Sequence, residues 1–155
     1  MTARAGSVRV YLPASLNDLS TLTTTGSLRP RAPGQAVTAA LRAAEPDGDI
    51  DEWEFLAFLA AAQASLGLLE AEGSPRRVVV SADIDPSQVR EVAHAGAGDV
   101  QLGGDVEFSE VAAVHVDGPE AEPTVSAVLS GAHPDSLDDV ALEWYSPSEV
   151  ADLLA

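Results

Sequence analysis

Residues 76–85, RRVVVSADID, constrain the fold more than any other segment of the chain. The run is rich in β-branched side chains, and both of its faces are apolar. A strand with two apolar faces is typical of the interior of a sheet that is covered on both sides. Residues 110–117, EVAAVHVD, form a second continuous strand pattern. We therefore expect two buried strands in a sheet that has other elements packed against it.

A long apolar helix is predicted before the first of these strand patterns. Residues 55–69 contain no charged side chain and lie between Glu54 and Glu70. The stretch is shorter than the roughly 20 residues that cross a bilayer, so it is typical of a buried helix. We expect a helix over residues 50–70 that is central and covered on several sides, because it is apolar all round.

The start of this helix resembles a calcium loop. Residues 47–55, DGDIDEWEF, have the D-x-D-x-D spacing of such a loop. A calcium loop needs Gly at its sixth position and a bidentate Glu at its twelfth, where this chain has Glu52 and Phe58. We therefore interpret Asp49 as the N-cap of the helix, with acidic side chains near the positive end of the helix dipole.

Shorter patterns predict the remaining elements. Residues 7–12 alternate in polarity and predict a strand that Pro13 ends. Capping-box patterns at Ser15 and at Ser146 predict two helices, the second at the C-terminus. Further strands are expected at residues 88–92, 100–102 and 141–145, and a further helix at residues 122–130.

These elements predict a single α/β domain over residues 1–155. The expected architecture is a mixed sheet of four to six strands, with a long central helix across it and a C-terminal helix closing one side. The alternative is an α+β fold of the ferredoxin-like type.

Composition excludes several kinds of chemistry. The chain has no Cys, and all eight basic residues are Arg. Thiolate nucleophiles, Cys-ligated zinc, lysine Schiff bases and a phosphate-loop lysine are therefore excluded. The net charge of −17 opposes binding to nucleic acids and to anionic membranes. Because the N-terminus lacks the apolar segment of a signal peptide, we expect a cytoplasmic protein.

Asp83 and Asp85 form the most site-like feature, because they follow an apolar strand. Carboxylates at the carboxyl edge of a parallel sheet often hold ligands or Mg²⁺. The D-x-D spacing is loosely similar to that of the haloacid-dehalogenase phosphotransferases, which usually carry a downstream Lys that this chain lacks. The alternative is a turn in which the carboxylates cap backbone N–H groups around Pro86.

His115 and Asp117 form a second candidate pair, since alternation places them on one face of their strand. Mononuclear iron oxygenases combine such an H-x-D pair with a distant second His. Neither His94 nor His133 stands in the usual order for that role. The alternative is a His115 that hydrogen-bonds within or beside the core.

Two other strands present polar and aromatic side chains. Arg9 and Tyr11 share one face of their strand, which suggests either an anion-binding surface or an ordinary cross-strand ion pair. Trp144 and Tyr145 point to opposite faces, so we expect one in the core and one near the surface.

Four segments carry a resemblance to a known family: VRVYLPA at residues 8–14, RRVVVSAD at 76–83, VAAVHVD at 111–117 and EWYSPSEVADLL at 143–154. Together they resemble a family of small actinobacterial conserved proteins of unknown function. The resemblance implies a cytoplasmic bacterial protein and assigns no functional residue.

These observations give two hypotheses for the function. The first is a non-catalytic binding or protein-interaction module without a cofactor, with a protein partner or a second copy of the chain. The second is a divalent-metal-dependent hydrolase or phosphotransferase, with Mg²⁺ as the cofactor. It would use Asp83 and Asp85 together with His115 or Asp117, provided that the ends of the two strands converge.

Overall fold

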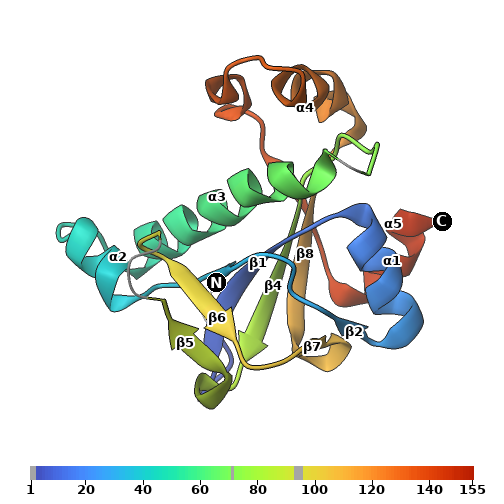
Figure 1. Ribbon diagram of the computed structural model, residues 1–155. Coiled ribbons are helices and arrows are strands. Elements are labelled where there is room, and N and C mark those ends of the chain that lie inside the picture. The colour runs from blue at the N-terminus through green and yellow to red at the C-terminus, as the bar shows by residue number, and fades with distance from the viewer. Residues whose placement is uncertain (1–2, 71, 93–95) are drawn as a thin grey trace.

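The structure is a computed structural model that describes residues 3–70, 72–92 and 96–155 (Figure 1). Its centre is a seven-stranded sheet in the order β5-β6-β3-β1-β4-β8-β9. The strands of this sheet are β1 Val8–Ala14, β3 Gly34–Gln35, β4 Val78–Ile84, β5 Val89–Glu91, β6 Asp99–Leu102, β8 Val111–Asp117 and β9 Leu142–Tyr145. A separate two-stranded sheet pairs β2 Ser27–Leu28 with β7 Val106–Glu107.

The predicted mixed sheet of four to six strands is wrong in two respects. Seven strands are present, and all neighbours in the described sheet are antiparallel. Strands as short as Gly34–Gln35 have too few residues to produce a periodic pattern. The structure is consistent with the alternative α+β class. It departs from a split βαβ unit because β1 and β4, which flank α3 in the chain, are direct neighbours.

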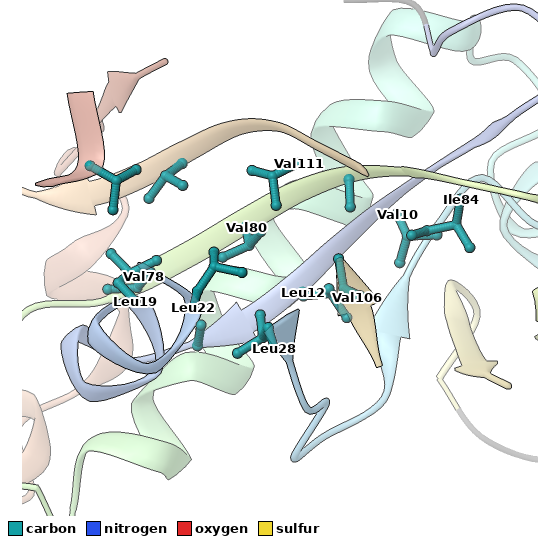
Figure 2. Close-up of a cluster of buried hydrophobic side chains, with 14 of the residues drawn as sticks. Val10, Leu12, Leu19, Leu22, Leu28, Val78, Val80, Ile84, Val106 and Val111 are labelled. Atoms are coloured by element: carbon teal, nitrogen blue, oxygen red, sulfur yellow. The ribbon is translucent and has the colours of Figure 1, made fainter. Parts of the chain in front are cut away.

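Elements on both faces of the sheet explain why its central strands are apolar on both sides. One face packs against α1 Leu16–Thr25, α5 Val150–Leu154 and the small β2-β7 sheet. Figure 2 shows this core, in which side chains of α1 and β2 meet side chains of β1, β4 and β8. The other face packs against α3 Ile50–Leu69 and α2 Ala39–Ala44. Antiparallel strands therefore become fully buried here without parallel pairing.

A smaller apolar cluster lies at the end of α3. There Leu69 packs with Val125 of α4 Glu122–Leu129 and with Leu137 of the 3₁₀ turn η4 Pro134–Leu137. In Figure 1, α4 lies at the end of α3 that is remote from α2. Within the described residues, no helix is both long enough and apolar enough to cross a lipid bilayer.

The predicted helix caps are confirmed. Asp49 is the N-cap of α3, and its carboxylate accepts the Glu52 N–H at 2.9 Å. Ser15 forms a capping box with Asp18 at the start of α1. Ser146 forms another with Glu149 in the turn that leads into α5.

The predicted end of the first strand at Pro13 is wrong. Pro13 lies within β1, opposite Val79 of β4. A proline cannot donate a backbone hydrogen bond, so it fits a strand only where that donor needs no partner. On its other side β1 pairs with β3 at Tyr11 alone, so Pro13 lies beyond that pairing.

The helix α3 packs on the sheet and, at its end, against α4 and η4, but its outer side is open, so the predicted cover on several sides is incomplete. Ser65 ties its buried side to the sheet, because the hydroxyl donates to the Ala14 carbonyl at 2.7 Å and accepts the Val78 N–H at 3.1 Å. Phe55 and Leu59, one helical turn apart, are 59% and 45% exposed. Since the sheet lies on one side of α3, a helix that is apolar all round leaves large apolar side chains in solvent.

Candidate functional site

The face of the sheet that contacts α3 carries a group of polar and aromatic side chains. Alternation along β1 and β4 brings Arg9 opposite Asp83 and Tyr11 opposite Ser81. On the next pair of strands, His115 of β8 lies opposite Trp144 of β9. Four adjacent strands therefore present polar or aromatic side chains to the same surface.

Arg9 and Asp83 form a buried cross-strand ion pair. The Arg9 Nε donates to Asp83 Oδ1 at 2.6 Å, and Nη2 donates to Oδ2 at 3.3 Å. Burial disfavours the charged guanidinium, but the hydrogen bond and the charge of Asp83 outweigh burial, so the pKa of Arg9 is raised. The ion-pair interpretation of Arg9 is therefore confirmed, although the pair is buried and not on an exposed strand face.

Glu54 joins this group from the first turns of α3. The Tyr11 hydroxyl donates to Glu54 Oε2 at 3.1 Å, and both side chains are buried. Burial, followed by the charge of Glu54, raises the pKa of Tyr11 to about 12. The phenol therefore stays protonated and is the donor, which links the helix to the sheet through a hydroxyl and a carboxylate.

His115 lies beside Ser81 and below α3. Its Nε2 is 2.9 Å from the Ser81 Oγ, and its ring meets Phe58 edge to face with 4.8 Å between centroids. Burial, and secondarily the charge of Arg9, lower the pKa of His115 to about 4. The ring is therefore neutral at neutral pH. A neutral His beside a Ser is the pairing found in nucleophilic catalysis, but Ser81 is only 1% exposed.

These side chains form the floor of an open cleft of about 570 Å³. Phe55 and Phe58 of α3 line one wall, and Trp144 of β9 lines the other. Phe55 is 59% exposed and Trp144 is 52% exposed, so both offer aromatic surface to solvent. Asp51 and Glu54 add two carboxylates to the lining. The volume lies within the roughly 300–1,000 Å³ that is usual for small-molecule sites.

The four residues singled out from the sequence do not converge in one site. Because β4 and β8 are antiparallel, the end of β4 at Asp83 lies beside the start of β8, whereas Asp117 lies at the end of β8. Asp117 is fully buried and forms a two-pronged ion pair with Arg77. The two carboxyl ends would be neighbours only if β4 and β8 were parallel. The antiparallel register of these strands corrects that expectation.

Asp85 has a local role. It accepts the Ser87 N–H at 2.9 Å and the Ser87 hydroxyl at 2.7 Å, and these hydrogen bonds lower its pKa. The alternative of a capping turn at Pro86 is therefore confirmed for Asp85. Of the four candidates, His115 alone lines the cleft.

The other histidines do not complete a metal site in the described chain. His133 is exposed and accepts the Asp135 N–H, while His94 lies outside the described residues. Across residues 3–70, 72–92 and 96–155, no group of three or more His, Asp or Glu side chains is arranged to hold a metal ion.

Sequence reasoning missed most of the cleft. The prediction that Trp144 and Tyr145 divide between surface and core is confirmed, since Trp144 is exposed and Tyr145 packs against the core. The sequence pattern marks Glu54 only as the boundary of an uncharged run. Its place in the first turns of an apolar helix is the available signal.

Comparison with known proteins gives a match to a protein family. The sequence pattern of a family described as a family of unknown function (DUF6912) matches residues 8–154. No curated protein and no solved structure matches the chain. The resemblance to a family of unknown function is therefore confirmed over nearly the whole sequence.

Proposed function

The chain belongs to the DUF6912 family, and because that family has no established function we propose one from the geometry of the cleft. We propose that the protein is a non-catalytic binding module whose ligand occupies the cleft between α3 and β9. The observation that carries this proposal is a polar floor, made of the buried Arg9 and Tyr11 and the half-buried His115, beneath exposed aromatic walls. Sites for small molecules combine apolar and aromatic walls with a few oriented polar groups in this way.

The polar floor is held in place by the fold. Arg9 is fixed by Asp83, Tyr11 by Glu54 and His115 by Ser81. Side chains that are already restrained lose little conformational entropy when a ligand binds. The exposed rings of Phe55 and Trp144 supply apolar area that a bound ligand would remove from water.

A fragment titration tests the proposal. ¹⁵N-labelled protein is titrated with a set of cationic, anionic and neutral aromatic fragments, and amide and indole shifts are followed by NMR. We expect shifts to cluster around the cleft for at least one class, and a Phe55→Ser/Trp144→Ser double variant to lose them. Leu59→Ser is the matched control, because it removes another exposed apolar side chain from α3 that does not line the cleft. Shifts confined to other surfaces, or unchanged in the double variant, would contradict the proposal.

A second candidate is a protein contact through α3. The exposed Phe55 and Leu59 favour it, because large apolar side chains that lie together on a surface often mark an interface. The contact would join two copies of the chain or bind another protein. Sedimentation velocity tests whether the chain forms a homodimer. Leu59→Glu should dissociate that dimer, and a wild-type protein that stays monomeric at high concentration would contradict the homodimer.

The hydrolase or phosphotransferase alternative receives no support from the geometry. Asp83 and Asp117, two of its four candidate residues, are held by Arg9 and Arg77 at different ends of the β4-β8 pair. We accordingly propose that the protein works without Mg²⁺. Adding Mg²⁺ should leave the melting temperature unchanged, and a rise that Asp83→Asn removes would restore the alternative.

Broader proposals come from the sequence and from the strand pairing. The charge of −17 supports a protein that binds neither nucleic acid nor anionic membranes. The absence of Lys, together with 27 Ala residues, supports a GC-rich genome and so an actinobacterial source. The absence of Cys is compatible with a cytoplasmic location, which cell fractionation tests. The pairing of β1 with β4, and of β9 with β8, supports one domain over residues 1–155. A single cooperative unfolding transition is then expected.

A further inference from the structure

We propose that the cleft selects an organic cation, an alkylammonium or guanidinium group, which binds against the rings of Phe55 and Trp144 and the carboxylates of Asp51 and Glu54. The inference rests on the proposed function, since it names the chemical class of ligand for the same cleft. Two independent properties of the lining carry it, namely its aromatic content and its charge.

The cleft concentrates the aromatic residues of the chain. The sequence has only seven Phe, Trp and Tyr residues, and four of them line this cleft: Tyr11, Phe55, Phe58 and Trp144. The face of an aromatic ring attracts cations, and the indole ring does so most strongly. Groups of aromatic rings are the usual device for binding quaternary ammonium groups.

The two tryptophans differ in a way that supports this argument. The guanidinium of Arg42 already lies over the Trp53 ring, 4.8 Å from its centroid. Trp144 is 52% exposed at the wall of the cleft. The chain therefore uses a cation on an indole ring within its own fold, and Trp144 presents the same kind of ring to solvent.

The charge of the cleft also favours a cation. Asp51, Glu54 and Arg9 line the cleft, and Asp83, which does not line it, neutralises Arg9, so these four side chains carry a formal charge of −2. His115 adds no charge at neutral pH, because burial lowers its pKa to about 4. An anionic ligand would be repelled both by this cleft and by the charge of −17 on the whole chain.

Glu54 is the carboxylate with most to gain from a cationic ligand. It is 9% exposed, and the hydroxyl that it accepts from Tyr11 is neutral. The charge of Arg9 attracts it, while the Nε and Nη2 of that guanidinium donate to Asp83. A buried carboxylate is costly unless a positive charge compensates it, and a cation in the cleft supplies that charge.

The experiment uses pairs of probes that differ only in charge. Choline and its neutral isostere 3,3-dimethyl-1-butanol form one pair, and ethylguanidinium and N-ethylurea form another. Binding is read from the indole N–H signals of ¹⁵N-labelled protein. Trp53 is the internal control, because its indole N–H donates to the Glu45 carbonyl and the residue does not line the cleft. Trp144→Phe assigns the two signals.

We expect at least one cation to shift the Trp144 signal saturably at concentrations up to about 50 mM, with its neutral partner about tenfold weaker. Binding should weaken as NaCl is added, because salt screens the carboxylates. A short uncharged peptide with one central Arg or trimethyl-lysine forms a further arm. If the peptide binds more tightly than the free cation, the natural ligand is a side chain of another protein. If the free cation binds more tightly than the peptide, the natural ligand is a small metabolite.

Two matched variants place the effect in the cleft. Glu54→Gln should weaken cation binding by about tenfold, whereas Glu52→Gln makes the same charge change on an exposed position of α3 and should leave binding unchanged. Asp51→Asn should weaken binding as well. Because Asp51 is exposed, this variant should fold normally, so the inference can still be tested if the Glu54 variant misfolds. Any one of four outcomes would overturn the inference. The neutral isosteres bind as well as the cations, an anion binds better than the cations, the Trp144 signal does not shift, or the Glu54 and Glu52 variants have equal effects. Fragments of another class that still map to the cleft would leave the proposed function intact.

Discussion

The carboxylate of Asp117 is completely buried and accepts three hydrogen bonds from Arg77. The Arg77 Nε donates to Asp117 Oδ2 at 2.8 Å, Nη2 donates to Oδ1 at 2.9 Å, and the backbone N–H donates to Oδ2 at 2.8 Å. The same Nη2 donates to the Val140 carbonyl at 3.0 Å. This pair therefore joins the end of β8, the start of β4 and the segment before β9. Asp117 is a structural residue in this arrangement.

Arg77→Met should destabilise the fold strongly. The variant leaves the Asp117 carboxylate buried without its cation, and breaking such a pair costs about 3–5 kcal/mol. The free energy of unfolding, measured with urea, gives the value. Arg31→Met is the control, since Arg31 pairs with Asp18 and Glu72 in a partly exposed position and should cost at most about 1 kcal/mol. Similar losses for the two variants would contradict the assignment.

Tyr11→Phe should cost about 1–2 kcal/mol of unfolding free energy, because Glu54 loses a buried donor while the ring is kept. Tyr145→Phe is the matched control. The Tyr145 hydroxyl donates to Glu143 at 2.9 Å in an exposed pair, so its loss should cost less than about 0.5 kcal/mol. Urea unfolding measures both. Because burial raises the pKa of Tyr11 to about 12, a spectroscopic titration should show its phenol ionising only near that pH.

The contrast between these residues shows what the sequence was able to predict. Capping boxes at Ser15 and Ser146 and the N-cap at Asp49 involve residues three positions apart, so the local pattern contains both partners. Arg9 and Asp83 are 74 residues apart, and Tyr11 and Glu54 are 43 apart. Their contacts depend on strand order and register, which no local pattern carries.

The same limit explains the predicted metal site. Burial of β4 and β8 on both faces is predicted correctly, but the pattern does not fix the relative direction of the two strands, and the metal hypothesis needs strand ends that converge. Because β4 and β8 are antiparallel, Asp83 and Asp117 lie at opposite ends of this strand pair. The cleft itself depends on where α3 crosses the strands, and that position is set by contacts such as Ser65 to Ala14.

Gly34→Ala should destabilise the protein by about 1–3 kcal/mol, because it adds a methyl group to a filled core. A Cβ at position 34 would lie 2.7 Å from the Val10 Cγ1 and 3.3 Å from the Leu12 Cδ2, so these core side chains would have to shift. Gly67→Ala is the control for the same chemical change. A Cβ there meets open space within α3, so the variant should gain about 0.5–1 kcal/mol from helix propensity. Thermal and urea unfolding compare them, and a stabilised Gly34 variant would contradict the packing argument.

Acid should destabilise the fold through His115. The pKa of this ring is about 4 in the folded protein, below the 6.5 of an unperturbed His, so the unfolded chain binds the proton more readily. The stability that the neutral ring contributes is complete above pH 6.5 and is lost as the pH falls from 6.5 to 4. At most it amounts to about 3 kcal/mol, from the size of the pKa difference. The ring contacts Ser81 and Phe58 and lies opposite Trp144, and the charge of Arg9 opposes its protonation.

The variant His115→Gln isolates this contribution, because its amide keeps a hydrogen-bonding group beside Ser81 and does not titrate in this range. Its unfolding free energy should fall less than that of the wild type between pH 7 and pH 4.5. His133→Gln removes an exposed imidazole and should follow the wild-type curve. NMR titration of the ring protons supplies an independent check, since His115 should titrate near pH 4. A His115 midpoint near 6.5, or parallel pH curves for the wild type and His115→Gln, would show that the ring is solvated and that the floor of the cleft is not buried as described.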